Sequence, residues 1–132
     1  MSTTPFNRDE WLLSHRPVLD LPPSDQSEVE AFHHQVLRPL LKLQNHLLLA
    51  QFAAWMKENK QTFANKEAGD HRVLIENACK TNKRLRAQAF GIIAGVMTRK
   101  EYLFYLDHQR EIHKRMTSMW SKRVFDEREE LV

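Results

Sequence analysis

The sequence predicts an all-α fold: an elongated antiparallel bundle of three to four helices, preceded by an N-terminal strap. Apolar residues recur every three or four positions in three long stretches, whereas a half-buried strand would alternate them by two. The 132 residues include only 3 Gly and 5 Pro, and Pro39 is the only proline after Ser24. The three apolar stripes are Val29, Phe32, Val36, Leu40, Leu43, Leu47, Ala50 and Ala54; Leu74, Ala78, Leu85, Ala89 and Ile92; and Tyr102, Tyr105, Ile112, Met116 and Met119.

The length indicates one domain, with residues 1–26 as a strap or arm and residues 27–132 as the bundle. Asn7 and Glu10 predict a cap for one short helical segment, which Pro17 ends. Pro22 and Pro23 then favour extended chain. We expect the apolar residues of this strap to lie across the bundle. The alternative is a mobile arm that orders only in an oligomer.

The first long helix is expected to begin at a capping box of Ser27 and Glu30, with Ser24 or Asp25 as alternative caps. Pro39 predicts a kink or break near residue 38, because proline removes a backbone hydrogen bond. The apolar stripe continues beyond Pro39, so both halves should face the same core. Residues 59–69 lack the stripe, which predicts a connection.

Two further long helices follow. Asp70 is the expected N-cap of a helix that runs to about Gly95. Gly91 and Gly95 lie four residues apart, which in a soluble helix favours a close helix crossing or a C-terminal stop over a membrane-type dimer seam. Thr98 and Glu101 form a second capping box for a helix that extends towards residue 128. The short turn at 95–98 makes these two helices antiparallel neighbours.

The composition is that of a folded globular protein, with 42% hydrophobic and 28% charged residues. No apolar run approaches the roughly 18 residues of a membrane span, and the N-terminus lacks the pattern of a secretory leader. We therefore expect a cytoplasmic protein with no membrane partner. The single cysteine, Cys79, is expected to be a small packing residue rather than a nucleophile.

No motif in the chain predicts an enzymatic activity. P-loop, dinucleotide-binding, nucleophile-elbow and zincin patterns are absent from the sequence. Glu30 with His33, and His108 with Glu111, have the three-residue spacing of di-metal bundles, but such a site needs further acidic residues on facing stripes. We therefore expect no catalytic residue, no metal and no cofactor.

The width of the first helix's apolar face predicts that the protein works by protein–protein interaction. Additional apolar residues extend this face beyond what two thin neighbouring helices cover. We expect a second, intermolecular face and a homo-oligomer, most simply a dimer. The residues assigned to this face are Leu37, Leu41, Leu48, Phe52 and Trp55.

Two alternatives remain open. Residues 57–123 contain 15 Lys and Arg but only 7 Asp and Glu, which indicates a surface for nucleic acid or an acidic partner. This surface would use Lys80, Lys83, Arg84, Arg110, Lys114 and Arg115. The second alternative is a small-ligand or metal-binding bundle with a polar core or pocket around His46, Asn82, Gln109 and His113. Asn82 and Gln109 fall on stripe positions, where a hydrogen-bonded pair would fix helix register.

Two segments, residues 36–45 and residues 91–98, resemble a small all-helical family of uncharacterised bacterial proteins. Some members of that family carry the label "glyoxalase". The resemblance supplies no catalytic residues. Glyoxalases of the metal-binding type resemble βαβββ repeats with His and Glu ligands on strands, and this sequence predicts no strands. The activity is therefore not carried over.

Overall fold

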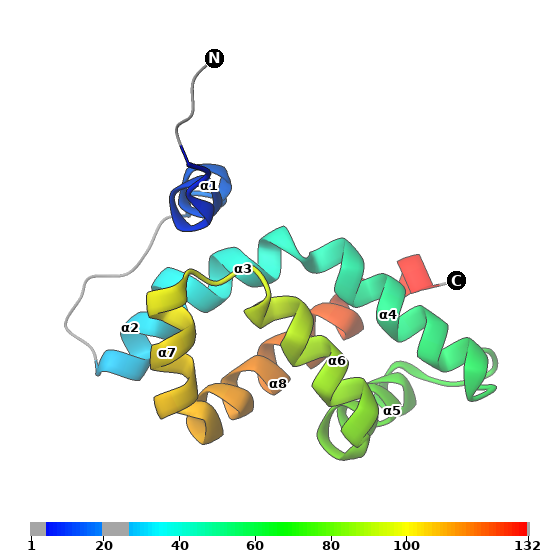
Figure 1. The fold of residues 1–132 in the computed structure, drawn as a ribbon. Helices are drawn as coiled ribbons and strands as arrows, with labels where there is room; N and C mark the ends of the chain where they lie inside the picture. Colours follow the sequence, from blue (N-terminus) through cyan, green and yellow to red (C-terminus); the bar gives the residue numbers. More distant parts are fainter. Residues whose placement is uncertain (1–4, 20–26, 132) are drawn as a thin grey trace.

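The computed structural model describes residues 5–19 and 27–131, and every regular element in this part of the chain is helical (Figure 1). The first half contains α1 (Arg8–His15), α2 (Glu28–Phe32), a π-helical turn (His33–Leu37), α3 (Arg38–Leu43) and α4 (Asn45–Glu58). The second half contains α5 (Ala68–Thr81), α6 (Lys83–Ala94), α7 (Arg99–Asp107), α8 (Gln109–Asp126) and a 3-10 turn (Arg128–Leu131). The predicted all-α class is confirmed.

The second and third predicted helices are each broken in two. Asn82 has extended backbone between α5 and α6, and its side chain accepts a hydrogen bond from the Leu85 N–H at 3.0 Å. Asparagine competes for backbone donors in this way, so it starts a new helix instead of continuing the old one. His108, at φ −124° and ψ 28°, separates α7 from α8. The prediction of continuous helices over 70–95 and 98–128 is therefore wrong.

The first predicted helix is also interrupted twice. The Arg38 N–H donates to the His33 carbonyl five residues back, and Pro39 follows in the first turn of α3. This π-helical turn confirms the predicted interruption at Pro39. A second break lies at Gln44, whose Nε2 donates to the Ile92 carbonyl of α6 at 2.9 Å. Because each residue of a helix turns the chain by about 100°, such irregular turns rotate the face that follows them.

This rotation changes which residues form the core. Leu43 and Leu47, on the predicted stripe, are 40% and 54% exposed. The expectation that one stripe faces the core on both sides of Pro39 is therefore wrong beyond Leu40. The core side chains are instead those assigned to an intermolecular face: Leu37, Leu41, Leu48 and Phe52 are buried, and Trp55 packs against them half-buried.

That assignment is corrected for a physical reason. The breaks at Asn82 and His108 create more short helices than the sequence predicts, and these cover the wide apolar face from within the same chain. Helix α4 packs against α6, α8 and the C-terminal 3-10 turn. Burying each large side chain contributes about 1.5–3 kcal/mol, so this face stabilises the monomer.

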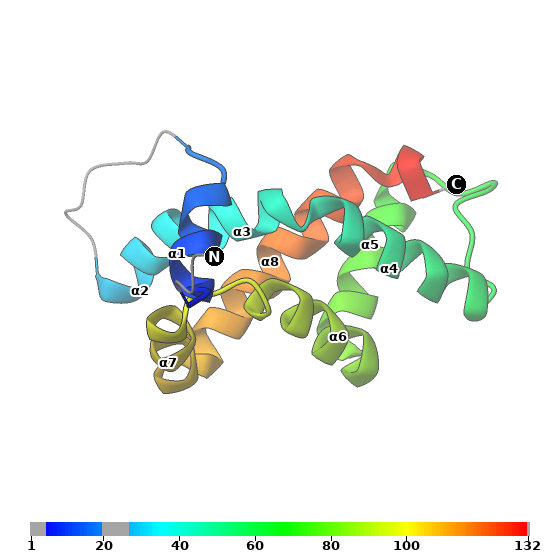
Figure 2. The same ribbon diagram turned by 45° about the horizontal axis from the view of Figure 1, so that its top comes forward.

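Helix α8 is the central element of the core. It packs against α4, α5, α6, α7 and the π-helical turn, and both ribbon views show it along the middle of the fold (Figure 1 and Figure 2). Its Trp120 is fully buried and meets Phe52 of α4 edge to face at 6.5 Å. Cys79 of α5 is also fully buried, and burial raises the pKa of its thiol to about 12. The cysteine therefore stays protonated, as a packing residue does.

Most predicted helix caps are present. The side chains of Asn7, Ser27 and Thr98 accept the N–H groups of Glu10, Glu30 and Glu101. The prediction of Asp70 as an N-cap is wrong by one turn: α5 begins after Glu67, and the Asp70 carboxylate accepts the Glu67 N–H at 3.4 Å. Gly95 is the C-cap residue of α6, so of the two alternatives left open for the glycines the C-terminal stop applies to Gly95.

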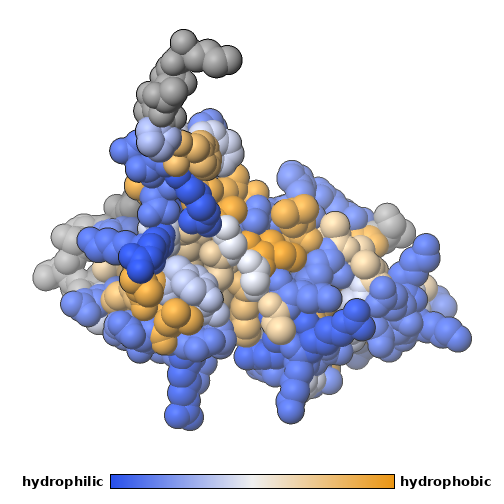
Figure 3. Space-filling model, viewed as in Figure 1, coloured by the Kyte–Doolittle hydropathy of each residue, from blue (hydrophilic) through white to orange (hydrophobic). Residues whose placement is uncertain are grey.

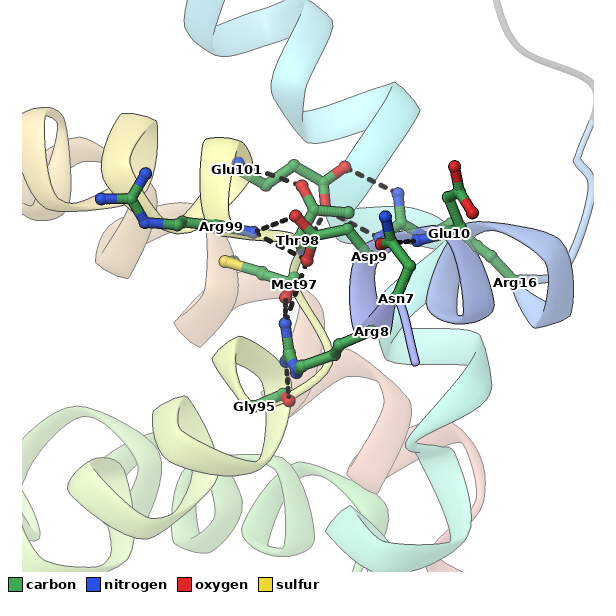
Figure 4. A network of polar contacts seen from close by, with 10 residues as sticks. All are labelled: Asn7, Arg8, Asp9, Glu10, Arg16, Gly95, Met97, Thr98, Arg99 and Glu101. Carbon is green, nitrogen blue, oxygen red and sulfur yellow. Dashed lines mark hydrogen bonds and ion pairs between the residues drawn. The ribbon is translucent and has the colours of Figure 1, made fainter. Parts of the chain in front are cut away.

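Helix α1 is attached to the connection between α6 and α7 by polar contacts (Figure 4). The Arg16 guanidinium donates to both carboxylate oxygens of Glu101 at 2.7 Å, and these side chains are only 10% and 15% exposed. Arg8 donates to the carbonyls of Met97 and Gly95, each at 2.9 Å. The Asp9 carboxylate accepts the Arg99 N–H at the start of α7, where the helix dipole favours negative charge.

The apolar side chains of this N-terminal segment are mostly exposed, although Leu12 and Leu19 are half-buried. Phe6, Trp11, Leu13 and Val18 are all exposed. Helix α1 lies against the bundle as expected of the strap, but the contacts that attach it are largely polar. The extended segment predicted from Pro22 and Pro23 lies outside the described residues.

The ion pair between Arg16 and Glu101 predicts an acid-dependent attachment of α1. Burial raises the pKa of Glu101, but the hydrogen bonds from Arg16 and Thr98 outweigh it and hold the pKa below its ordinary value. The pair therefore stabilises the attachment fully above the ordinary carboxyl pKa, and this contribution is lost as pH falls through the lowered one. Glu101→Gln keeps an acceptor for the capping box but removes the charge, and should weaken attachment by about 1–3 kcal/mol.

The NMR shift of the Arg99 amide, which donates to Asp9 of α1, measures this attachment during an acid titration. Glu101→Gln should displace the shift towards that of a chain truncated before residue 17 and remove part of its pH dependence. Glu10→Gln, an exposed change on α1, is the control. An unchanged Arg99 shift and titration in Glu101→Gln would show that the ion pair does not hold α1.

Candidate anion-binding site

A polar cavity lies between α5, α6 and α8, with a volume of about 350 Å³. Its basic side chains come from three helices: Lys80 from α5, Arg86 from α6 and Lys114 from α8. The other lining residues are Glu76, Thr117, Ser118 and Ser121. Three cations and three hydroxyl groups thus meet in a space of the size that small-molecule pockets have.

Arg86 is fixed in place by its neighbours. One terminal nitrogen of its guanidinium donates to the Cys79 carbonyl at 2.6 Å and to Thr117 Oγ1 at 3.2 Å. Its Cζ lies 5.0 Å from the centre of the Phe90 ring. The Cys79 carbonyl belongs to the last turn of α5, where helix carbonyls lack intrahelical partners. Arg86 can donate to this carbonyl because the break at Asn82 turns α6 back towards the C-terminal end of α5.

The charge in the cavity is not neutralised by the chain. Glu76 is the only acidic residue among the described residues that line it. The four ion pairs of the described chain involve Arg8, Arg16, Arg115 and Lys122, so Lys80, Arg86 and Lys114 form none with a described carboxylate. An anion entering the cavity would therefore meet a net positive charge at short range.

The hydroxyl groups complete the lining on α8. Thr117 Oγ1 donates to the His113 carbonyl at 2.7 Å, so it can accept from Arg86 at the same time. Ser121 donates to the Ser118 carbonyl at 3.2 Å. The Ser118 hydroxyl is exposed and has no hydrogen bond to a described side chain, which leaves it available to a ligand oxygen. Three cations beside an available hydroxyl suit a phosphate or carboxylate group.

A second groove adjoins this cavity on the other side of Arg86. It lies between α6 and the α7–α8 pair and has a volume of about 440 Å³. Its lining residues are Lys83, Arg86, Ala87, Phe90, Gly91, Ala94, Tyr102, Tyr105, Gln109 and His113. Arg86 lines both spaces, so the cavity and the groove are neighbours.

The wall of the groove contains a neutral histidine. Burial and the nearby Arg86 charge lower the pKa of His113, and burial raises the pKa of Tyr105. The Tyr105 hydroxyl is hydrogen-bonded to His113 Nε2, and both pKa shifts favour the uncharged side chains. The His113 ring is stacked on Phe90 at 4.1 Å between ring centres. Phe90, Tyr105 and His113 thus form an aromatic wall of the groove.

The structure divides the predicted basic surface. Lys80 and Lys114 meet in the cavity, and Lys83 borders the adjoining groove. Arg84 lies elsewhere, beside a separate cavity between α4 and α6. Arg115 pairs with Glu111 at 3.5 Å, and Arg110 is exposed on α8. The six predicted residues therefore divide between the cavity, the adjoining groove and positions outside both.

The predicted polar core around four residues does not form. His46 is exposed, and Asn82 caps α6 instead of pairing with Gln109. Gln109 is exposed as well, because the break at His108 moves it off the inner face. Only Gln109 and His113 come together, and they do so in the groove.

Sequence reasoning did not assign Arg86, Thr117, Ser118 or Ser121 to a site. Arg86 belongs to the basic run at 80–86, but its contacts depend on the unexpected turn at Asn82. The three hydroxyl residues could have been grouped from the sequence, because positions 117, 118 and 121 have the spacing of one helix face. This face differs from the apolar face, and it is the one turned to α5 and α6.

Two kinds of feature are absent from the described residues. They contain no group of three or more His, Cys, Asp and Glu side chains that could hold a metal ion. None of their helices has the length and apolar character needed to cross a bilayer.

Comparison with other proteins gives no assignment. No protein-family model matches the chain, and neither a curated protein nor a solved structure is similar to it. The resemblance of residues 36–45 and 91–98 to a helical bacterial family therefore stays a prediction. The site has to be interpreted from its own geometry.

Proposed function

We propose that this chain is a non-enzymatic, cytoplasmic protein that binds a phosphate-bearing small molecule in the cavity between α5, α6 and α8. The observation that carries the proposal is the convergence of Lys80, Arg86 and Lys114 on a lining that includes the Ser118 hydroxyl, without a described carboxylate in an ion pair with any of the three cations. Charged hydrogen bonds of this kind are the strong ones that proteins use for phosphate.

The geometry favours a small ligand over nucleic acid. A phosphate backbone needs basic side chains in a row along one surface. Here Arg84 and Arg115 lie away from the cavity that Lys80 and Lys114 share. Most aromatic side chains that would stack bases are buried or half-buried in the core. Nucleic-acid binding is therefore the alternative outcome of the test below.

The lysines of the cavity provide the test. We expect isothermal titration calorimetry to show binding of pyrophosphate to the full chain at low ionic strength. The double variant Lys80→Ala/Lys114→Ala should lower this affinity by about tenfold or more, because two charge-assisted hydrogen bonds are lost. Arg86 is left unchanged, since it also bonds to Cys79 and Thr117 and its removal would disturb the fold.

The matched control is Lys57→Ala/Lys100→Ala, which removes the same charge from exposed positions on α4 and α7. It should bind pyrophosphate as the wild type does. Equal losses in the two variants would reject the cavity as the site. If pyrophosphate does not bind but a single-stranded oligonucleotide does, with affinity that falls steeply as salt rises, the nucleic-acid alternative replaces this proposal.

Self-association is a second candidate function, and exposed apolar side chains favour it. Helix α7 exposes Tyr102, Leu103 and Leu106, and α1 exposes Trp11 and Leu13. Figure 3 shows hydrophobic surface over both helices, together with further hydrophobic patches in the middle of the same face. Exposed apolar patches of this kind are typical of contact surfaces between proteins. The dimer proposed here uses this surface, not the buried residues of α4.

Leu103→Glu tests the dimer. We expect light scattering to show a mass that rises from monomer to dimer with concentration in the wild type, and a monomer in Leu103→Glu, because the contact would bury an unpaired charge. Val73→Glu, at an apolar position of α5 that is 66% exposed, is the control and should still dimerise. A wild-type monomer at every concentration would reject self-association.

A further inference from the structure

The groove beside Arg86 contains space that no described side chain fills. Gly91 lies inside α6, and a Cβ placed there would meet nothing within 4 Å. Gly95 differs, since a Cβ there would meet the Gly91 carbonyl at 2.9 Å. A glycine within a helix destabilises that helix relative to alanine. At position 91 no described neighbour is close enough to exclude a larger side chain, so tight packing does not explain the glycine. The groove therefore reaches the backbone of α6 at Gly91.

Flat aromatic groups border this space. Tyr102, 43% exposed, stands edge to face with Tyr105 at 5.7 Å between ring centres. Phe90 and His113 are stacked, with only 10° between their planes. The exposed amide of Gln109 lies on the same groove and carries both donors and an acceptor. A planar polar ring is the ligand shape that such a lining accommodates.

Arg86 connects the groove to the cationic cavity. Its hydrogen bonds to Cys79 and Thr117 use one terminal nitrogen, and its Nε and other terminal nitrogen have no hydrogen bond to a described residue. A ligand with a ring in the groove would therefore place an attached anionic group beside Arg86, within the cavity that Lys80 and Lys114 line.

We propose that the ligand is a phosphate ester carrying a planar heteroaromatic ring, with a nucleoside monophosphate as its simplest form. The phosphate occupies the cavity of Lys80, Arg86 and Lys114. The ring lies over Gly91 beside Tyr102, and the Gln109 amide bonds to its edge. This inference rests on the phosphate-binding function proposed above and names the class of ligand for that site.

Calorimetry on the full chain with three probes tests it: inorganic pyrophosphate, ribose 5-phosphate and adenosine monophosphate. We expect adenosine monophosphate to bind about tenfold more tightly than ribose 5-phosphate, since a base stacked on an aromatic side chain adds binding energy of that order. Gly91→Leu should abolish this difference, because its side chain would occupy the space of the ring. Pyrophosphate binding should not change in Gly91→Leu.

Gly69→Leu is the matched control, because Gly69 is also helical and a Cβ there would also meet nothing within 4 Å. It should retain the tighter binding of adenosine monophosphate. Tyr102→Ala should reduce this binding without affecting that of pyrophosphate. Equal affinities for adenosine monophosphate and ribose 5-phosphate, or unchanged adenosine monophosphate binding in Gly91→Leu, would overturn this inference and leave the phosphate-binding function standing. If none of the three probes binds, both proposals fall.

Discussion

The turn at Asn82 is the constraint on which the rest of the structure depends. Its side chain bonds to the Leu85 N–H and ends one helix where the apolar spacing alone would continue it. The two shorter helices pack at an angle, so α5 and α6 both contact α8, and α6 also contacts α4. A single straight helix could not cover both neighbours. The same turn brings Arg86 back to the unpaired Cys79 carbonyl, and this places the guanidinium between α5 and α8.

The sequence predicts the helix class and most helix starts because these depend on neighbouring residues. Ser27 and Thr98 cap helices with donors three residues away, so short spacing is enough to find them. The direction in which the apolar face of a helix points is not determined by neighbouring residues in this way. It changes at the π-helical turn and again at Gln44, whose amide bonds to the Ile92 carbonyl, 48 residues further on. A tertiary contact therefore decides whether Leu47 or Leu48 enters the core, and local spacing cannot show it.

The candidate site is likewise only partly predictable from the sequence. A local excess of Lys and Arg indicates that basic residues matter between residues 57 and 123, and Lys80 and Lys114 do share a cavity. The sequence does not indicate which cations meet, because this depends on how α5 and α8 cross. Nor does it reveal the open space at Gly91, since a glycine four residues before a helix stop suggests packing or termination. Only the arrangement of α6 against α7 and α8 shows that this glycine is covered by neither.

The chain uses its charged groups in two contrasting ways, and the contrast supports a binding role for the cavity. Arg16 and Glu101 satisfy each other through two short hydrogen bonds, and their charge is neutralised in a half-buried contact that holds α1. Arg86 is oriented just as firmly, but by neutral groups, a carbonyl and a hydroxyl, so its positive charge remains available. Holding a cation in a fixed orientation removes side-chain entropy before any ligand arrives, which lowers the cost of binding an anion. A solvated surface lysine lacks this preorganisation. Arg86 is therefore the residue around which an anionic ligand would be oriented, with Lys80 and Lys114 as adaptable partners at the rim.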